Sequence, residues 1–228
     1  MSIMFVLCLG IAAAVDAQET PAATSSAVAP PVEASSTPPV EEGQPEAVAQ
    51  EQRSTLAFSL RPEGGTVWSV WYGYGFNHVV NNSAPEIDIS SVGIRWAHLW
   101  AERGSGFLRG HPSVAVELIP MNIFLEDSQS TWAGGLNLLY EHHFAVRGRV
   151  LPVCRFGAGF LYSSREIPEG ETEHNFSLLA ALGLDILVTP TTSLLLEYRF
   201  HHMSNANTGY RNPGINAHTV IFGLSFFR

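Results

Sequence analysis

The stretch Ala217-His-Thr-Val-Ile-Phe-Gly-Leu-Ser-Phe-Phe227 alternates between two kinds of side chain. The even positions from Val220 to Phe226 are large and apolar, whereas most odd positions from Thr219 to Ser225 are smaller and more polar. Successive side chains of a strand point to opposite faces. The stretch therefore predicts a strand with one lipid-compatible face and one face that fits a barrel interior filled by side chains.

Seven similar segments precede this one, and Gly, Pro, Asn and charged clusters separate them. The eight segments are residues 66–75, 87–100, 114–124, 131–143, 150–163, 175–188, 191–202 and 217–227. Their lengths suit tilted membrane strands of about 9–11 residues or slightly more. After residues 1–17, no stretch of the chain offers about 20 continuous apolar residues for a membrane-spanning helix. We therefore predict an all-β fold, an eight-stranded antiparallel transmembrane β-barrel.

The chain before the first strand has a different composition. Residues 1–17 contain the apolar run Ile3–Val15, which is too short to span a bilayer and is typical of a secretory signal peptide. Residues 18–53 are rich in Pro, Ala, Glu, Ser and Thr and almost free of aromatic side chains, which predicts a disordered linker. This leaves residues 54–228 for the barrel, which we expect in the outer membrane of a Gram-negative bacterium.

Charge and composition narrow the class of protein further. The formal net charge is -9, and much of it lies in residues 18–53, which hold six glutamates against one arginine. The sequence contains no basic patch of the kind that would indicate a nucleic-acid partner. A soluble eight-stranded barrel of the lipocalin type is the structural alternative. Charged residues at 14% and aromatic residues at 11% favour the membrane.

Connection lengths predict how the barrel is oriented. Outer-membrane barrels keep short turns on the periplasmic side and longer loops outside. Residues 145–149 and 189–191 are then periplasmic, and residues 76–86, 164–174 and 203–216 are extracellular. Residues 101–113 form the exception, a long connection on the periplasmic side. The seventh strand then runs outward and ends near the cell surface.

The end of the seventh strand carries residues that could take part in catalysis, in the motif His202-x-Ser204-Asn205. His202 continues the apolar parity of the strand, so we expect His202 and Ser204 on the lipid side, where a histidine is costly unless it has a partner and a purpose. His202 can take the Ser204 proton, and Ser204 can attack an ester carbonyl. The backbone N–H groups of Asn205, Ala206 and Asn207 can hold the oxyanion. The opposing interpretation is that these are polar residues of an interfacial loop.

Two charged residues of the same strand have the opposite parity. Glu197 and Arg199 are expected to point into the lumen and to pair there, because a charge inside a small barrel needs a partner. Glu197 therefore has the wrong orientation to assist His202.

The motif His202-x-Ser204-Asn205, the following Gly-x-x-Asn-Pro-Gly-x-Asn216 and the terminal aromatic strand resemble the PagL family of outer-membrane lipid A deacylases. The resemblance implies an eight-stranded barrel that removes the ester-linked 3-O-acyl chain of lipid A without metal or cofactor. It implies His202 as the base, Ser204 as the nucleophile and the Asn205 region as the oxyanion hole. Lipid A, or lipopolysaccharide, is the implied partner, and a homodimer stays open.

One position departs from the family pattern. Members of the family place a glutamate twelve residues after the serine, and this chain has Asn216 there. Asparagine can accept a hydrogen bond from the imidazole, but it cannot stabilise an imidazolium by charge. Two hypotheses remain: a serine esterase that uses Ser204, His202 and Asn216, and a non-catalytic outer-membrane barrel with a structural or surface-interaction role. A pore is disfavoured, because side chains fill the interior of eight strands.

Overall fold

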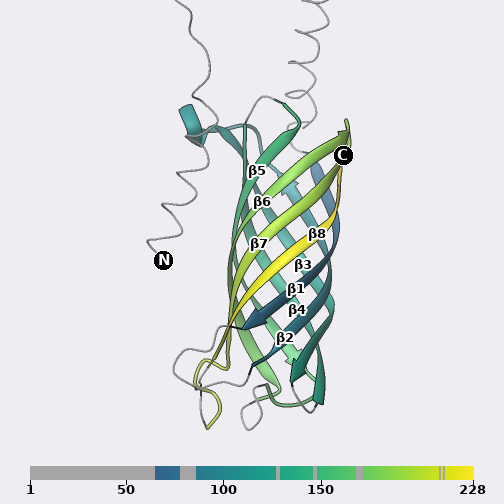
Figure 1. Cartoon of the computed structure of the whole chain (residues 1–228). Coiled ribbons are helices and arrows are strands. Elements are labelled where there is room, and N and C mark those ends of the chain that lie inside the picture. The colour runs from purple at the N-terminus through teal and green to yellow at the C-terminus, as the bar shows by residue number, and fades with distance from the viewer. Residues whose placement is uncertain are drawn as a thin grey trace, which may run out of the picture. The chain divides into compact units, whose positions relative to one another are not determined.

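The computed structural model describes residues 65–77, 86–126, 129–145, 148–167, 172–210, 212 and 214–228, so the predictions for residues 1–17 and 18–53 lie outside the described residues. The described chain forms a closed barrel in which sequential strands pair antiparallel and β1 closes onto β8 (Figure 1). The strands are β1 (Thr66–Asn77), β2 (Asp88–Leu99), β3 (Gly110–Glu126), β4 (Gln129–Phe144), β5 (Val150–Ser163), β6 (His174–Thr189), β7 (Thr192–Ser204) and β8 (Ile215–Phe227). The predicted fold class is confirmed.

The observed strands overlap all eight predicted segments, and the largest difference is at the start of β3. This strand begins at Gly110, because the segment Gly110–Pro112 pairs with the end of β4 at His142–Phe144. The connection between β2 and β3 is therefore residues 100–109 rather than 101–113. It contains a short 3-10 helix, η1 (Gly106–Leu108).

The outer wall of the barrel is apolar. The large exposed side chains include Trp68 and Tyr72 on β1, Leu194 on β7 and Phe222 on β8. Most residues that alternate with this outward-facing row are buried. The lipid-facing parity predicted for β7 and β8 is the observed one. No helix among the described residues is long and apolar enough to cross a membrane.

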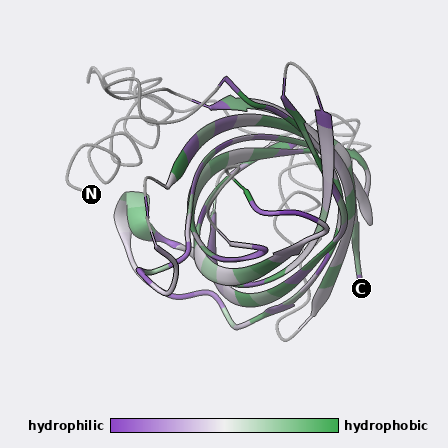
Figure 2. Ribbon diagram, turned by 90° about the horizontal axis from the view of Figure 1, so that it is seen from below, coloured by the Kyte–Doolittle hydropathy of each residue, from purple (hydrophilic) through white to green (hydrophobic). Residues whose placement is uncertain are grey.

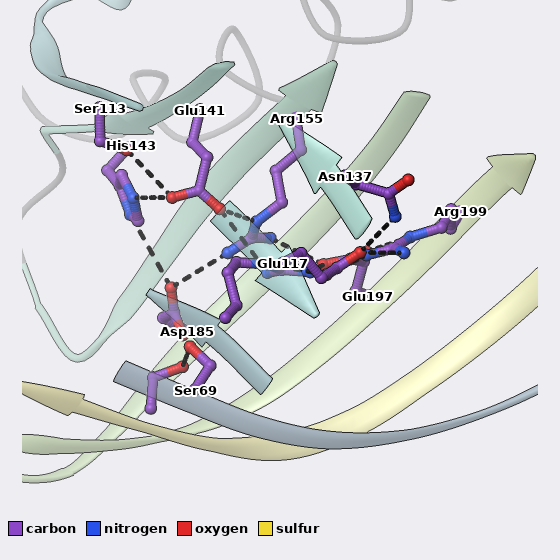
Figure 3. Close-up of polar contacts among 12 residues, drawn as sticks. Ser69, Ser113, Glu117, Asn137, Glu141, His143, Arg155, Asp185, Glu197 and Arg199 are labelled. Carbon is purple, nitrogen blue, oxygen red and sulfur yellow. Dashed lines mark hydrogen bonds and ion pairs between the residues drawn. The ribbon is translucent and has the colours of Figure 1, made fainter. Parts of the chain in front are cut away.

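Charged side chains fill the lumen, and Glu117 lies at the centre of one group. Its carboxylate accepts hydrogen bonds from Arg95 Nη2 at 2.6 Å and from Arg199 Nη1 at 2.8 Å, and it is fully buried. Arg199 Nε also donates to Glu197 Oε1 at 2.8 Å, which confirms the predicted pair (Figure 3). Such pairing is required because an isolated buried charge is costly.

A second luminal group forms around Glu141. Its carboxylate accepts from Arg155 Nε at 2.7 Å and from Ser113 Oγ at 3.0 Å, and His143 Nε2 lies 3.4 Å away (Figure 3). The salt bridge between Arg155 Nη1 and Glu197, at 3.1 Å, links the two groups. Together they occupy the barrel interior with paired charges, as the small diameter of an eight-stranded barrel requires.

The two ends of the barrel differ. The C-terminus, η1 and the tight β6–β7 turn lie at one end, and residues 164–167 and 205–210 lie at the other (Figure 1). By the rule that longer loops are extracellular, the first end is periplasmic and the second extracellular.

Candidate active site

The candidate site lies where β7 ends and β8 begins, on the outer wall of the extracellular end. The two strands pair so that His202 lies opposite Asn216. Both residues, like Ser204, alternate with buried neighbours and belong to the outward-facing row of their strands. The fold thus places all three predicted catalytic residues on one face at one end of the barrel.

His202 and Asn216 are in direct contact. The distance between His202 Nδ1 and Asn216 Oδ1 is 2.8 Å. An amide oxygen only accepts, so Nδ1 carries a proton, and in the neutral ring Nε2 holds the lone pair. Asn216 therefore sets the tautomer in which the imidazole can act as a base through Nε2.

Ser204 follows His202 on the same face, and Gly214 packs against both. A β-carbon at position 214 would lie 3.1 Å from His202 Cε1 and 3.7 Å from Ser204 Cβ. Gly214 also has φ +64, a conformation that favours glycine. Residue 214 thus lies directly beside His202 and Ser204. The Ser204 hydroxyl makes no hydrogen bond to any described residue.

The turn after Ser204 is held by Asn205, which is buried. Its Oδ1 accepts from the Asn207 backbone N–H at 2.9 Å, and its own backbone N–H donates to Asn212 Oδ1 at 3.2 Å. Ala206 and Asn207 both have a left-handed backbone, with φ 52 and 63. Of the three predicted oxyanion donors, Asn205 and Asn207 already donate within the turn. The Ala206 N–H has no acceptor among the described residues.

Sequence reasoning missed the contributions of Asn212 and Gly214. The Asn205 backbone N–H donates to Asn212 Oδ1 and so orients the Asn212 side-chain amide. The Asn212 Nδ2 group has no acceptor within the described part of the chain. Both residues belong to the Asn-Pro-Gly motif that was visible in the sequence. Only the closure of the loop shows that Gly214 lies beside His202 and Ser204 and that Asn212 contacts Asn205.

A second polar pair on the outer wall was also missed. His218 lies two residues beyond Asn216 on β8, and its Nδ1 is 2.6 Å from the Tyr198 hydroxyl. Its ring also packs at a tilt against Phe200, with a centroid distance of 5.5 Å. An aromatic wall containing one hydrogen-bonded histidine thus continues from the site toward the membrane interior.

Carboxylates are absent from the site among the residues that the structure describes. Glu141 and Glu197 both point into the lumen, and they are bonded to arginines there. His201, next to the predicted base, also points inward and is buried. In the described residues, no group of three His, Cys, Asp or Glu side chains could hold a metal ion.

The closed barrel, its apolar outer wall and the polar site set into that wall define a membrane β-barrel protein. A family model described as lipid A 3-O-deacylase (PagL) matches residues 56–225. The chain therefore belongs to the lipid A 3-O-deacylase family, and it is an outer-membrane β-barrel of a Gram-negative bacterium.

Comparison with solved structures finds the same fold in one enzyme, and two further barrels are similar to the chain. The crystal structure of the outer membrane enzyme PagL aligns with 68% of this chain and 97% of its own, at 15% identity and TM-score 0.50. Neisserial surface protein A aligns with 72% of this chain and 99% of its own, at 13% identity and TM-score 0.49. The protein Ail of Yersinia pestis aligns with 73% and 100%, at 12% identity and TM-score 0.48. A search of curated proteins finds no match, and none of the comparisons supports a homodimer.

Proposed function

We propose that this protein hydrolyses the ester-linked 3-O-acyl chain of lipid A with Ser204 as the nucleophile. Ser204 Oγ bonds to the acyl carbonyl carbon, and its proton passes to His202 Nε2. The tetrahedral intermediate then loses the sugar oxygen, which takes the proton from His202. Water, deprotonated by the same nitrogen, attacks the acyl-serine, and the fatty acid leaves as Ser204 regains its proton.

The observation that carries this proposal is the contact between His202 Nδ1 and Asn216 Oδ1 at 2.8 Å. It leaves His202 Nε2 as a base on the same outward face as Ser204. A catalytic pair in the outer wall at the extracellular end meets outer-leaflet lipid, and in a Gram-negative outer membrane that lipid is lipid A. Membership of the lipid A 3-O-deacylase family supports the same substrate.

Two donors are suited to the oxyanion. The Ala206 N–H belongs to the turn that begins at Ser204, and no described residue accepts from it. The Asn212 side-chain oxygen accepts from the backbone N–H of Asn205, the residue after Ser204, and no described residue accepts from the Asn212 Nδ2 group. Removing one such donor typically lowers kcat by about 10²–10³-fold. Asn205 and Asn207 then act by shaping the turn.

The test is mass spectrometry of lipid A from cells that express the wild type, Ser204→Ala or Ser90→Ala. Ser90 is a matched control, because it also lies on the outer row of its strand and is bonded to Tyr72 at 3.2 Å. Wild type and Ser90→Ala should release the 3-O-acyl chain, whereas Ser204→Ala should not. If the wild type leaves lipid A intact, or if Ser204→Ala still deacylates it, the proposal fails.

The second candidate function is a non-catalytic barrel with a structural or surface-interaction role. Two observations favour it: the group facing His202 is a neutral amide, and the Ser204 hydroxyl bonds to no described residue. This candidate predicts that a fluorophosphonate probe leaves Ser204 unlabelled in the folded protein. Labelling that Ser204→Ala abolishes and Ser90→Ala retains would exclude it.

A further inference from the structure

Residues 100–109, here called the periplasmic lobe, form an ordered projection that the proposed reaction does not use. They join β2 to β3 and include η1. Both the side view and the view along the barrel show η1 outside the ring of strands (Figures 1 and 2). The lobe therefore extends sideways from the periplasmic end, toward the membrane that surrounds the barrel.

Backbone hydrogen bonds fix the base of the lobe. Arg103 and Gly110 exchange two of them, at 2.8 and 2.9 Å, and the Ala145 N–H donates to the Arg109 carbonyl at 2.7 Å. Gly104 and Gly106 have φ 85 and 57, which lets the chain reverse within a few residues. The lobe is thus a folded unit rather than an open loop.

Side chains of the barrel hold the lobe as well. His142 Nε2 lies 3.1 Å from the Leu108 carbonyl, and its ring packs edge-on against Phe144 at a centroid distance of 4.8 Å. His111 Nδ1 lies 3.2 Å from the Trp100 carbonyl. These contacts fix the direction in which the tip of the lobe points.

The tip presents apolar side chains that nothing described in the chain covers. Phe107 is 44% exposed and Leu108 53% exposed, and Trp100 at the base is 40% exposed. Aromatic and aliphatic side chains of this kind enter the interface between lipid headgroups and acyl chains. Their place at the end of an outer-membrane barrel makes the periplasmic leaflet the surface they meet.

The charged side chains near the lobe favour anionic lipids of that leaflet. The Arg103 guanidinium is exposed and pairs with no described residue, while Arg109 forms an ion pair with Glu102. Arg149 and Arg228 lie at the same end of the barrel, where Glu102 is the one acidic side chain outside the lumen among the described residues. The extracellular rim is the opposite, because its described residues include Glu86, Asp88, Glu126, Glu166 and Glu173 against Arg165.

We infer that the periplasmic lobe is a binding site for anionic phospholipid of the periplasmic leaflet. Phe107 and Leu108 insert beside the acyl chains, and Arg103 and Arg109 contact the phosphate. Arginine suits this role because its planar guanidinium forms two parallel hydrogen bonds to phosphate oxygens. The inference is independent of the proposed esterase activity.

The experiment uses the full chain folded into phosphatidylcholine vesicles that contain a minority of phosphatidylglycerol. In one set of vesicles the phosphatidylglycerol carries bromine on its acyl chains, and in a second set the phosphatidylcholine does. Quenching of Trp100 fluorescence then reports which lipid lies beside the lobe. Subtracting the signal of Trp100→Phe isolates that tryptophan. We expect phosphatidylglycerol to be enriched about fivefold over phosphatidylcholine, since one arginine near an anionic surface contributes about that factor and Glu102 offsets the charge of Arg109. Equal quenching by the two lipids would overturn the inference.

Three variants separate the contributions. Arg103→Gln/Arg109→Gln should bring the enrichment close to one, whereas Arg165→Gln, on the extracellular rim, should preserve it. Phe107→Ser/Leu108→Ser should lower quenching by both lipids, because the lobe no longer inserts. Heat-modified migration on gels checks that each barrel is folded. Enrichment that survives in the double arginine variant, or quenching that survives in the double serine variant, contradicts the inference.

Discussion

Replacing Asn216 by aspartate tests the contact on which the proposed mechanism depends. The substitution keeps the size of the side chain and exchanges an amide oxygen for a carboxylate oxygen at the same place. That oxygen lies 2.8 Å from His202 Nδ1. When His202 takes the Ser204 proton, the ring becomes positively charged. The amide maintains the tautomer but does not neutralise this charge, whereas a carboxylate would do both.

The size of the effect follows from the two kinds of hydrogen bond. A neutral bond contributes about 0.5–1.5 kcal/mol, and a bond to a charged group contributes about 1.5–3 kcal/mol. The difference, about 1–2 kcal/mol, acts only once the imidazolium forms. It should therefore lower the barrier to acylation and increase the rate about tenfold. Asn216→Ala removes the orienting bond and should slow the reaction by about fivefold to tenfold.

The assay follows release of the 3-hydroxy fatty acid from lipid A in mixed micelles at one fixed pH, with mass spectrometry as the readout. Ser204→Ala supplies the background rate. The expected order of rates is Asn216→Asp, wild type, Asn216→Ala and then background. An aspartate variant that is folded but no faster than the wild type would refute the role assigned to the charge. An alanine variant as fast as the wild type would refute the orienting role of Asn216.

Two further predictions concern the lumen and the loop. Glu117→Gln leaves Arg95 and Arg199 without their shared carboxylate inside the barrel, and it should lower the free energy of unfolding by about 3–5 kcal/mol in urea titrations. Gly214→Ala adds a β-carbon 3.1 Å from His202 Cε1 at φ +64. It should cost about 1–2 kcal/mol of stability through strain and reduce deacylation by more than that loss of stability explains.

The chain offers matched controls for both. Glu173→Gln changes an exposed carboxylate that accepts from the Tyr162 hydroxyl at 2.8 Å, so it should leave the unfolding midpoint nearly unchanged. Gly106→Ala introduces a similar backbone strain at φ +57, but its β-carbon would meet nothing within 4 Å. It should preserve the deacylation rate. Equal loss of activity in the two glycine variants would mean that strain, not the position beside His202, explains the effect.

The barrel was predictable because its pattern is local. A strand has a side-chain period of two, so the alternation from Val220 to Phe226 already separates the lipid face from the lumen. The same parity assigned Glu197 and Arg199 to the interior, and the structure confirms their ion pair. The start of β3 was not predictable in this way. Gly110 and Pro112 are weak strand formers that are held by pairing with β4.

In the candidate site, too, some features follow from local sequence and others from pairing between strands. The sequence by itself determined that His202 and Ser204 share one face of a strand, because that depends only on their spacing. It also determined that Asn216 occupies the third position of the motif. The partners of Glu141 depended on the register of β4 with its two neighbouring strands, which places Glu141 opposite Ser113 on β3 and opposite Arg155 on β5.

Only the tertiary structure decided the contacts that cross between strands and loops. The register of β7 and β8 places Asn216 opposite His202, and a shift by one residue would have sent Asn216 to the lumen. Loop closure brings Gly214 next to His202 and engages the backbone N–H group of Asn205 with the Asn212 side chain. Periodicity fixes which way a side chain points, but which side chains meet is set by pairing between segments distant in sequence.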